Sequence, residues 1–440
     1  MVKKINFGLI GAGNIGSATI RYIDENLRHI QERTGYQPVP AVVYDTDKKR
    51  VKFLDELETL KPIVAGSAEG IIKNPYIQII VEATGKDEEA LDIILRSFRS
   101  GKSVVTPNKL VIAKHMKEIF EEARKYGQSI GFEASVMGGV PIINTIRDTT
   151  DEAHGHLGIL NGTTNYILTQ IYHGSKMMEA LKDAKQKGYA EPDPTMDLNG
   201  SDTACKNNIL TAILHETDVG FQAVANELYR EGIMNLLEFD IDFAFNEFEY
   251  VVKLLGKSRL REDGKLEIGT YPFLIPKDHP LASISDTVNA VYVNFKERGT
   301  HLYTGRGAGP DPTKVALVDD IIRIARERQA KNVYVPLIEK DIPIADPLEH
   351  LSRFYLRFDA VDRPGVLTKL SGVLGDNHIS IASVIQPERK SAENSTVPVV
   401  LLTHESKAGD VFNAINYINT TYAGKLITGK TKVIRIENSH

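Results

Sequence analysis

Lysine and carboxylate side chains gather at two places where polar residues and glycines interrupt apolar segments of the sequence. The first is Thr106-Pro-Asn108-Lys109, which follows an apolar run. The second runs from Gly188 to Lys206 and holds four carboxylates and a lysine in a proline-containing loop and the start of a predicted helix. Asp202 and Lys206 are spaced i, i+4, so on a helix they share one face. They can contact one substrate together, or they form a weak exposed ion pair.

A glycine motif near the N-terminus predicts a dinucleotide site. The apolar run Ile5–Ile10 leads into Gly11-Ala-Gly13-Asn14-Ile15-Gly16, and Ser17–Arg28 has helical character. The first glycine permits a tight turn, the second lets a pyrophosphate approach the backbone, and the helix N-terminus offers N–H groups to the anion. The pattern alone is weak, but a strand before it and a helix after it make it specific. The alternative is a tight strand–helix turn without a ligand.

Asp45 ends the next predicted strand and bears on the choice of dinucleotide. It lies further downstream than the usual spacing of about 20 residues, which the polar insertion Asn26–Gln37 explains. A carboxylate there binds a ribose 2′-hydroxyl and repels a 2′-phosphate, which favours NAD. The basic run 48–50 argues for NADP unless it is a solvated helix start. The preference stays open, with a slight lean to NAD.

The elements that position these residues begin with a parallel sheet. From Ile5 to Phe132, short apolar runs alternate with amphipathic stretches, which is typical of an α/β, Rossmann-type domain. Lys109 would follow the carboxyl end of one strand, where open α/β sheets bind their ligands. We therefore predict a dinucleotide-binding domain over residues 1–132. Its expected strands are Ile5–Ile10, Pro40–Tyr44, Ile77–Ala83, Ser103–Thr106 and Ser129–Phe132.

Two further domains are expected. Residues 133–309 mix glycine-rich turns, a helix over Ser201–Glu216 and a strand over Val288–Phe295, which predicts an α+β substrate-binding and dimerisation domain. Residues 310–330 contain a helix over Thr313–Arg328 that we expect to pack back onto the first domain. Residues 331–352 are rich in proline and charge, as in a linker.

The C-terminal residues 353–440 show the order strand, helix, strand, strand, helix, strand. This order is typical of a ferredoxin-like βαββαβ domain. The expected strands are Arg353–Val361, Ser380–Ile385, Val397–Thr403 and Lys432–Glu437, and the expected helices are Val366–Asp376 and Gly409–Tyr422.

Bulk properties exclude several classes of function. A chain of 440 residues is too long for one hydrophobic core. A net charge of −5 without a basic stripe argues against a nucleic-acid partner. No run approaches the roughly 18 apolar residues of a membrane span. The single cysteine, Cys205, cannot form an internal disulfide, so we expect a cytoplasmic protein.

These segments together resemble homoserine dehydrogenase, in the long form with a C-terminal ACT domain, from Phe7 to about Ile436. The ACT resemblance rests on the turn that begins at Asp362 and on Ile379–Gln386. The resemblance implies a reversible NAD(P)-dependent interconversion of L-homoserine and L-aspartate 4-semialdehyde in threonine, methionine and isoleucine biosynthesis. The most specific matching segments are Thr106–Lys109, Phe132–Pro141, Gly158–Tyr166, Gly188–Pro194, Asp197–Lys206 and Gly305–Gly309.

The resemblance also implies roles for single residues. Lys206 and Lys109 would lie at the reacting centre with Asp202 beside them. Oxidising an alcohol requires loss of its O–H proton, and a lysine desolvated beside a second lysine has a lowered pKa. We therefore expect Lys206 to be the acid and base, and Lys109 to hold the oxygen. Glu191 would bind the substrate ammonium, with Tyr189, Gly162, Thr163 and Asp197 nearby.

Two more sites follow from the same resemblance. A Na⁺ or K⁺ site would use Glu133 and the backbone carbonyls of Val136, Gly138 and Val140, and the alternative is a glycine-rich turn without an ion. The dinucleotide would be held by Gly11, Gly13, Asn14, Ile15, Gly16, Asp45, Thr84, Thr106, Lys109 and Gly307.

The sequence departs from the family pattern at two positions. Tyr44 stands where the family often has an arginine before the acidic residue, which weakens a 2′-phosphate pocket. Cys205 stands where an arginine commonly precedes the helix lysine, and we interpret it as a small packing residue. Two other functions stay open: a dehydrogenase of a different semialdehyde or hydroxy amino acid, and a non-catalytic amino-acid sensor.

The expected partners follow from the ACT resemblance. Such domains bind amino acids at paired interfaces, and threonine is the first candidate effector. The alternative is a domain that serves dimerisation only. We expect a homodimer or a homotetramer.

Overall fold

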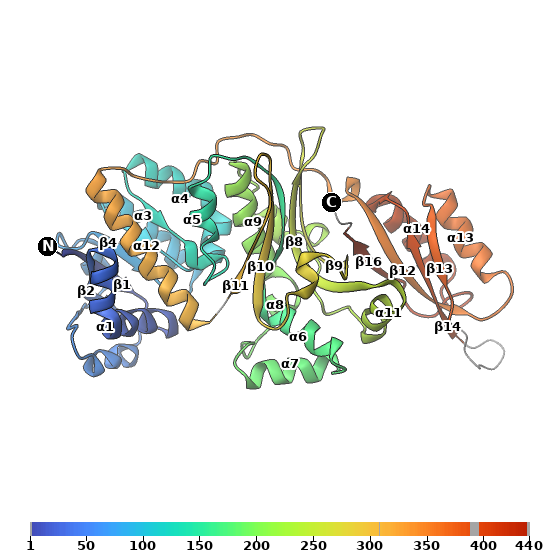
Figure 1. The fold of residues 1–440 in the computed structure, drawn as a ribbon, viewed down its shortest axis with the longest axis horizontal. Coiled ribbons are helices and arrows are strands. Elements are labelled where there is room, and N and C mark those ends of the chain that lie inside the picture. Colours follow the sequence, from blue (N-terminus) through green and yellow to red (C-terminus); the bar gives the residue numbers. More distant parts are fainter. Residues whose placement is uncertain (1, 308, 388–395, 438–440) are drawn as a thin grey trace. The chain divides into compact units, whose positions relative to one another are not determined.

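The computed structural model describes residues 2–307, 309–387 and 396–437. The chain divides into two compact units. Figure 1 draws the helices and strands, coloured along the sequence. Within the described ranges, no helix combines the length and the apolar character that crossing a membrane would require. Unit 1 comprises Met1–Gly162, Ala204–Ala225 and Thr287–Asp341, and unit 2 comprises Thr163–Thr203, Asn226–Asp286 and Ile342–His440.

Unit 1 contains a six-stranded parallel sheet in the order β3-β2-β1-β4-β5-β6. This order is that of dinucleotide-binding sheets, and it confirms the predicted Rossmann-type fold. The strands are β1 (Lys3–Ile10), β2 (Tyr36–Tyr44), β3 (Ile63–Val64), β4 (Ile79–Glu82), β5 (Ser103–Val105) and β6 (Ile130–Gly131). The helices between them are α1 (Asn14–Thr34), η1 (Lys48–Glu56), α2 (Ala68–Ile72), α3 (Asp87–Arg99) and α4 (Lys109–Lys125).

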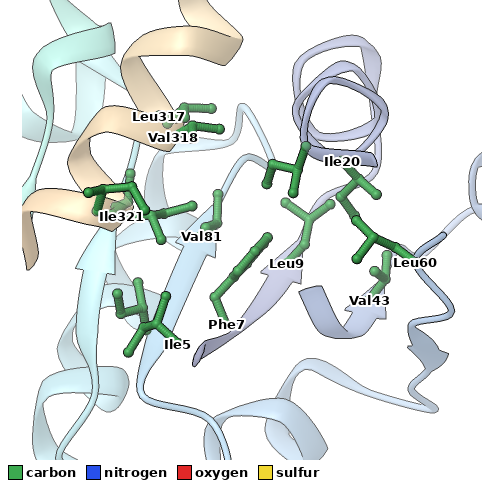
Figure 2. Packing of buried hydrophobic residues seen from close by; sticks show 14 of the residues in the cluster. Ile5, Phe7, Leu9, Ile20, Val43, Leu60, Val81, Leu317, Val318 and Ile321 are labelled. Atoms are coloured by element: carbon green, nitrogen blue, oxygen red, sulfur yellow. The ribbon is translucent and has the colours of Figure 1, made fainter. Parts of the chain in front are cut away.

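The core of this sheet joins segments that lie far apart in the chain. Phe7 and Leu9 of β1 and Val81 of β4 are fully buried, and they pack in one cluster with Leu317 and Ile321 (Figure 2). The last two belong to α12 (Pro310–Ala330), which lies beside α1 in Figure 1. Each such side chain contributes about 1.5–3 kcal/mol by leaving water. α12 therefore covers the nucleotide sheet.

Element boundaries differ from the predicted ones at β2 and α12. β2 begins at Tyr36 instead of Pro40 and contains Pro38. Prolines are tolerated on an unpaired strand edge, and β3 pairs only with Val42 and Val43 of β2. α12 begins three residues earlier than predicted, because prolines fit the first turn of a helix.

α1 also extends beyond its predicted end. It continues past Arg28 to Thr34 and stops at Gly35, whose φ of 77° lies in the left-handed region. The polar stretch that we interpreted as an insertion is therefore mostly additional helix. The remaining elements of unit 1 are η2 (Glu133–Ser135), α5 (Ile142–Arg147), α9 (Ser201–His215) from Ala204 onward, α10 (Gln222–Ala225), and the antiparallel strands β7 (Ala153–Ile159), β10 (Val288–Phe295) and β11 (Gly299–Arg306).

Unit 2 contains the strands of the C-terminal domain and the long hairpin β8–β9. The βαββαβ order is confirmed, and its strands pair in the order β16-β12-β14-β13. β16 also pairs in parallel with β9, so hairpin and C-terminal domain share one sheet. The strands are β8 (Tyr250–Leu260), β9 (Leu266–Pro276), β12 (Leu351–Val361), β13 (Ile381–Ile385), β14 (Thr396–Thr403), β15 (Ser406–Lys407) and β16 (Lys432–Ile436).

Unit 2 also contains α-helices and short 3-10 helices. They are α6 (Gly162–Tyr172), α7 (Met177–Gln186), α8 (Thr195–Leu198), η3 (Glu227–Tyr229), α11 (Glu238–Phe248), η4 (Pro280–Ser283), η5 (Pro347–Glu349), α13 (Val366–Asp376) and α14 (Ala408–Thr421).

Candidate active site

In the glycine turn between β1 and α1, the surrounding backbone leaves no space for a side chain at the first and last glycines, but it leaves space at the middle one. Gly11 has a φ of +99°, and a Cβ atom there would lie 2.4 Å from the Ala83 carbonyl oxygen. A Cβ at Gly16 would lie 2.1 Å from the Gly11 oxygen. At Gly13 the nearest atom that a Cβ would meet is Nη1 of Arg50, at 3.7 Å. An anion can therefore approach the backbone at Gly13, which fits a pyrophosphate.

The start of α1 suits the same anion. Gly13 is the N-cap of α1, and no side chain caps the helix there. Asn14 is exposed in the first turn, whereas Ile15 packs against the core of the sheet. Helix N-termini carry unsatisfied N–H groups and a partial positive charge, so this end of α1 favours a phosphate.

Asp45 lies one residue beyond β2 and binds the glycine turn itself. Its Oδ2 accepts a hydrogen bond from the Ala12 amide at 2.7 Å, and its Oδ1 accepts one from the Asp47 amide at 2.8 Å. Nη1 of Arg50 lies 3.8 Å from Oδ2, and the Asp45 side chain is only 4% exposed. The carboxylate therefore fixes the turn, and the largely exposed Arg50 is the more accessible charge.

A carboxylate that sequence reasoning missed joins two of the predicted cofactor residues. Glu82, the last residue of β4, is fully buried. Its Oε1 accepts hydrogen bonds from the amide and the hydroxyl of Thr84, both at 2.7 Å, and its Oε2 accepts one from the Thr106 hydroxyl at 2.6 Å. Burial raises the pKa of Glu82, and the bonds from Thr106 and Thr84 oppose this rise. The available signal was an acidic residue at the end of an apolar run.

The same network reaches the first predicted lysine. The Thr106 hydroxyl accepts a hydrogen bond from the Asn108 amide at 3.0 Å, and Oδ1 of Asn108 caps α4 by accepting one from the Val111 amide at 3.3 Å. Lys109 is the first residue of α4 and is half-buried. Glu82 therefore fixes the start of the helix that carries Lys109.

The second lysine and its acidic neighbour both lie buried in α9. Asp202 is 5% exposed and Lys206 is 7% exposed, one helical turn apart. Nζ of Lys206 donates a hydrogen bond to the Leu160 carbonyl oxygen at 2.9 Å. An exposed surface pair is therefore wrong for these residues, because charged groups are buried only where a specific partner or a ligand compensates them.

A buried histidine supports α9 next to Lys206. Nε2 of His156, in β7, lies 2.8 Å from Oδ1 of Asn207. Burial, and then the charge on His215, lower the pKa of His156 to about 3. The imidazole is therefore neutral at physiological pH, and it holds the helix without adding a positive charge.

In unit 2, the predicted substrate motif is a loop held by short polar contacts. The Thr163 hydroxyl donates to the Tyr189 carbonyl oxygen at 2.7 Å. The rings of Tyr166 and Tyr189 lie 5.0 Å apart, edge to face. Lys185 Nζ donates to the Pro192 carbonyl oxygen at 2.9 Å. These contacts leave Glu191 exposed on an ordered loop, where it can meet a substrate ammonium.

The predicted site residues are distributed over both units. Asp197 lies in α8, half-buried. Unit 2 holds four residues expected to bind substrate, Thr163, Tyr189, Glu191 and Asp197, and the expected catalytic residue Asp202. Unit 1 holds Gly162 of the expected substrate set and both lysines, Lys109 and Lys206. It also holds the residues expected to bind dinucleotide or cation: Gly11, Gly13, Asn14, Ile15, Gly16, Asp45, Thr84, Thr106, Glu133, Val136, Gly138, Val140 and Gly307.

Two of these glycines leave no space for a side chain. A Cβ at Gly162 would lie 2.8 Å from the Thr287 carbonyl oxygen, and one at Gly307 would lie 1.9 Å from Cγ of Asn289. Asn289 is fully buried, and its amide oxygen and nitrogen make no hydrogen bond with any residue that the structure describes. An unpaired buried amide is costly, so Asn289 is a second polar group that sequence reasoning missed.

Glu133 was expected to bind a cation, and its carboxylate accepts hydrogen bonds from two backbone amides. Its oxygens accept hydrogen bonds from the amides of Ile143 and Asn144, at 2.9 and 2.8 Å. Burial, and then the charge on Asp320, raise the pKa of Glu133 to about 8. Glu133 and Gly138 line one cavity of about 440 Å³.

The donor set there fits a monovalent cation better than a divalent one. No group of three or more His, Cys, Asp or Glu side chains is placed to hold a metal in the ranges that the structure describes. A site built from one carboxylate and backbone carbonyls carries a low charge. A buried carboxylate with a raised pKa would gain from a cation beside it.

Three family models match consecutive parts of the chain. The model described as homoserine dehydrogenase, NAD binding domain, matches residues 11–133. The model described as homoserine dehydrogenase matches residues 141–322, and the ACT domain model matches residues 354–419.

Whole proteins match over almost their full length. The homoserine dehydrogenase of Pseudomonas aeruginosa is 33% identical, with 99% of each chain covered, and that of Neisseria gonorrhoeae is 32% identical, with both chains fully covered. Among solved structures, a homoserine dehydrogenase from Thiobacillus denitrificans is 33% identical with a TM-score of 0.89, covering 99% of each chain.

Proposed function

Because this chain belongs to the homoserine dehydrogenase family of NAD(P)-dependent oxidoreductases, we propose that it interconverts L-homoserine and L-aspartate 4-semialdehyde, with Lys206 as the acid and base. The observation that carries the assignment is the burial of Lys206 in α9, in the unit that also holds Lys109 and the glycine turn. Such a lysine can exchange a proton with a substrate oxygen.

The nicotinamide dinucleotide, when bound, supplies the hydride acceptor for alcohol oxidation. The residues of the chain transfer the proton and position the substrate. Lys206 takes the proton of the homoserine hydroxyl, and the Leu160 carbonyl orients its amine for that transfer. Lys109 holds the substrate oxygen, and Asp202 balances the charge on Lys206 once it is protonated. In the reverse direction Lys206 returns the proton to the aldehyde oxygen.

Substrate recognition is assigned mainly to residues of unit 2, with Gly162 from unit 1. Glu191 binds the substrate ammonium, because a carboxylate on an ordered loop attracts that charge. Tyr189 and Thr163 form the wall of this loop and are joined by their own hydrogen bond. Gly162 and Asp197 complete the set. The rigid loop limits the rotational freedom of a bound amino acid.

For the dinucleotide, we assign Gly11–Gly16, Asp45, Thr84, Thr106, Lys109 and Gly307, and we favour NAD over NADP. Asp45 adds negative charge at the end of β2, where a 2′-phosphate would lie. Arg50 opposes this preference, since it lies 3.8 Å from Asp45 and is mostly exposed. We therefore expect NAD to be preferred while NADP remains usable.

A Na⁺ or K⁺ ion would be held by Glu133 and the carbonyls of Val136, Gly138 and Val140. The raised pKa of Glu133, about 8, supports the assignment. The ion would neutralise this carboxylate and stiffen the turn before α5. We further propose that the protein is a homodimer or a homotetramer in the cytoplasm. Threonine is the proposed effector, bound at the ACT domain.

Steady-state kinetics tests this function against both alternatives. We expect a homoserine-dependent rise in the absorbance of reduced nicotinamide, with a higher kcat/KM for NAD than for NADP. A chain that reduced a different semialdehyde would turn over that compound and leave homoserine untouched. An amino-acid sensor without catalysis would bind amino acids with no rise at all. Either result would overturn the proposal.

A further inference from the structure

Unit 2 contains a cavity of about 520 Å³ that none of the proposed substrate or dinucleotide residues lines. Its walls come from the turn after α8, the segment that contains η3, strand β9, and two elements of the ACT domain, α14 and β16. The residues that matter most are Leu198, Glu227, Glu231, Tyr271, Phe412 and Arg435. The cavity is large enough for a small metabolite with its hydration water.

Arg435 is a buried positive charge at this cavity. It is only 7% exposed, it lines the cavity, and Glu231 is the acidic group whose charge acts on it. Its guanidinium carbon lies 3.7 Å from the centre of the Tyr271 ring and 5.4 Å from that of Phe412. Ring faces attract a cation, but they leave its N–H groups unpaired. A buried guanidinium of this kind is suited to a carboxylate.

Opposite charges and apolar surface lie at the same cavity. Glu231 is partly exposed, and one of its oxygens lies 3.4 Å from Nζ of Lys432. Glu227 is exposed at the rim. Leu198 and Met234 add apolar side chains to the lining. A ligand that matches all three features has a carboxylate, an ammonium and a short aliphatic part.

We propose that this cavity binds a small aliphatic α-amino acid, with the carboxylate on Arg435, the ammonium on Glu231 and the side chain towards Leu198 and Met234. The inference rests on the proposed function, since a regulated amino-acid dehydrogenase gives such a ligand a purpose. It differs from the paired ACT interface, because most of the cavity wall belongs to segments outside the ACT domain.

The cavity wall is connected to α9 through short backbone contacts. Nη1 of Arg230 donates to the Asn199 carbonyl oxygen at 2.8 Å, and the Ile233 amide donates to the Leu198 oxygen at 2.9 Å. Oδ1 of Asn199 accepts from the amide of Ser201, the first residue of α9. A Cβ at Gly232 would lie 1.9 Å from the Leu198 oxygen, so these segments cannot move independently. A ligand that shifted them would move the start of α9.

The test is calorimetric titration of the full-length protein with L-threonine, L-isoleucine and L-valine. We expect at least one to bind at millimolar concentration or better, and its amide, which lacks the carboxylate, to bind at least tenfold more weakly. Arg435→Gln and Glu231→Gln should each weaken binding at least tenfold. Met234→Arg should also weaken binding at least tenfold, because the longer side chain fills an exposed part of the cavity. Met234 is itself exposed, so this variant disturbs no buried side chain. It keeps the test valid if Arg435→Gln fails to fold.

Val384→Asp is the matched control at the edge strand β13 of the ACT domain, and it should leave binding unchanged. Loss of binding in Val384→Asp with normal binding in Met234→Arg would place the amino acid at the ACT edge and overturn the inference. Silence from all three amino acids would overturn it as well. Homoserine oxidation by the wild type, measured in parallel, separates either result from a failure of the proposed function.

Discussion

The carboxylate of Glu82 and the hydroxyl of Thr106 lie 2.6 Å apart at the carboxyl ends of the neighbouring strands β4 and β5. The other oxygen of Glu82 binds Thr84 through its amide and its hydroxyl. One buried carboxylate thus sets the positions of two residues expected to contact the dinucleotide. Through Asn108 it also sets the start of α4 at Lys109.

Glu82→Gln should weaken this arrangement while keeping its shape. The amide nitrogen of glutamine cannot accept the hydrogen bonds that the carboxylate accepts, which costs about 1–3 kcal/mol of stability. We expect KM for the dinucleotide to rise roughly tenfold, the equivalent of about 1.4 kcal/mol. Steady-state kinetics and thermal unfolding measure both effects. Glu32→Gln, which removes an exposed ion pair with Arg28, is the control and should change neither.

Lys206→Ala should collapse turnover without loss of dinucleotide binding. Removing a general acid and base lowers kcat by about 10²–10⁴-fold. Fluorescence titration with the reduced dinucleotide should give a Kd close to that of the wild type. Lys296→Ala, an exposed lysine paired with Glu152, should behave as the wild type. Near-normal turnover in Lys206→Ala would refute the catalytic assignment.

Arg50→Ala should change the choice between the two dinucleotides. The exposed guanidinium is the positive charge placed nearest to Gly13 and Asp45, so its removal leaves the carboxylate unopposed. We expect kcat/KM for NADP to fall about tenfold, the equivalent of one charge-assisted hydrogen bond, and that for NAD to stay nearly constant. Lys49→Ala is the matched control from the same basic run. Equal losses with both dinucleotides would argue for a structural role of Arg50.

We expect Glu133 to make stability depend on pH and on monovalent cations. Its folded pKa of about 8 exceeds the ordinary value of 4.5, so its contribution to stability is complete below about pH 4.5 and is lost as the pH rises through 8. A bound K⁺ would replace the proton. We therefore expect KCl to raise Tm more at about pH 9 than at about pH 6, relative to tetramethylammonium chloride at equal concentration. In Glu133→Gln this difference should disappear, and its persistence would place the ion elsewhere.

Local pattern was sufficient for the two most regular parts of the fold. The glycine spacing from Gly11 to Gly16 predicts a turn, and the structure places Gly11 at a φ of +99° and leaves no space for a Cβ atom at Gly11 or Gly16. The helix over Val366–Asp376 has the predicted ends, since its apolar periodicity and the preceding Gly365 are both local signals. Strand and helix periodicities were therefore sufficient to predict the Rossmann-type and ACT domains.

The partners of buried polar groups were not predictable in this way. Glu82 follows an ordinary apolar run, and only the neighbouring ends of β4 and β5 turn it into an acceptor for Thr84 and Thr106. Asp45 stays a predicted ribose ligand, and no local pattern indicated that its oxygens also hold the glycine turn.

Arg435 is another buried polar residue whose neighbours could not be predicted from the sequence, and these neighbours lie far away along the chain. In sequence it is an arginine between apolar residues of the predicted strand Lys432–Glu437, and the strand pattern names no partner for it. The parallel pairing of β16 with β9 instead brings it against Tyr271. Periodicity reports which residues of one element share a face, and the sequence alone determined those faces. What covers a face depends on which distant segment packs there, and only the tertiary structure decided that.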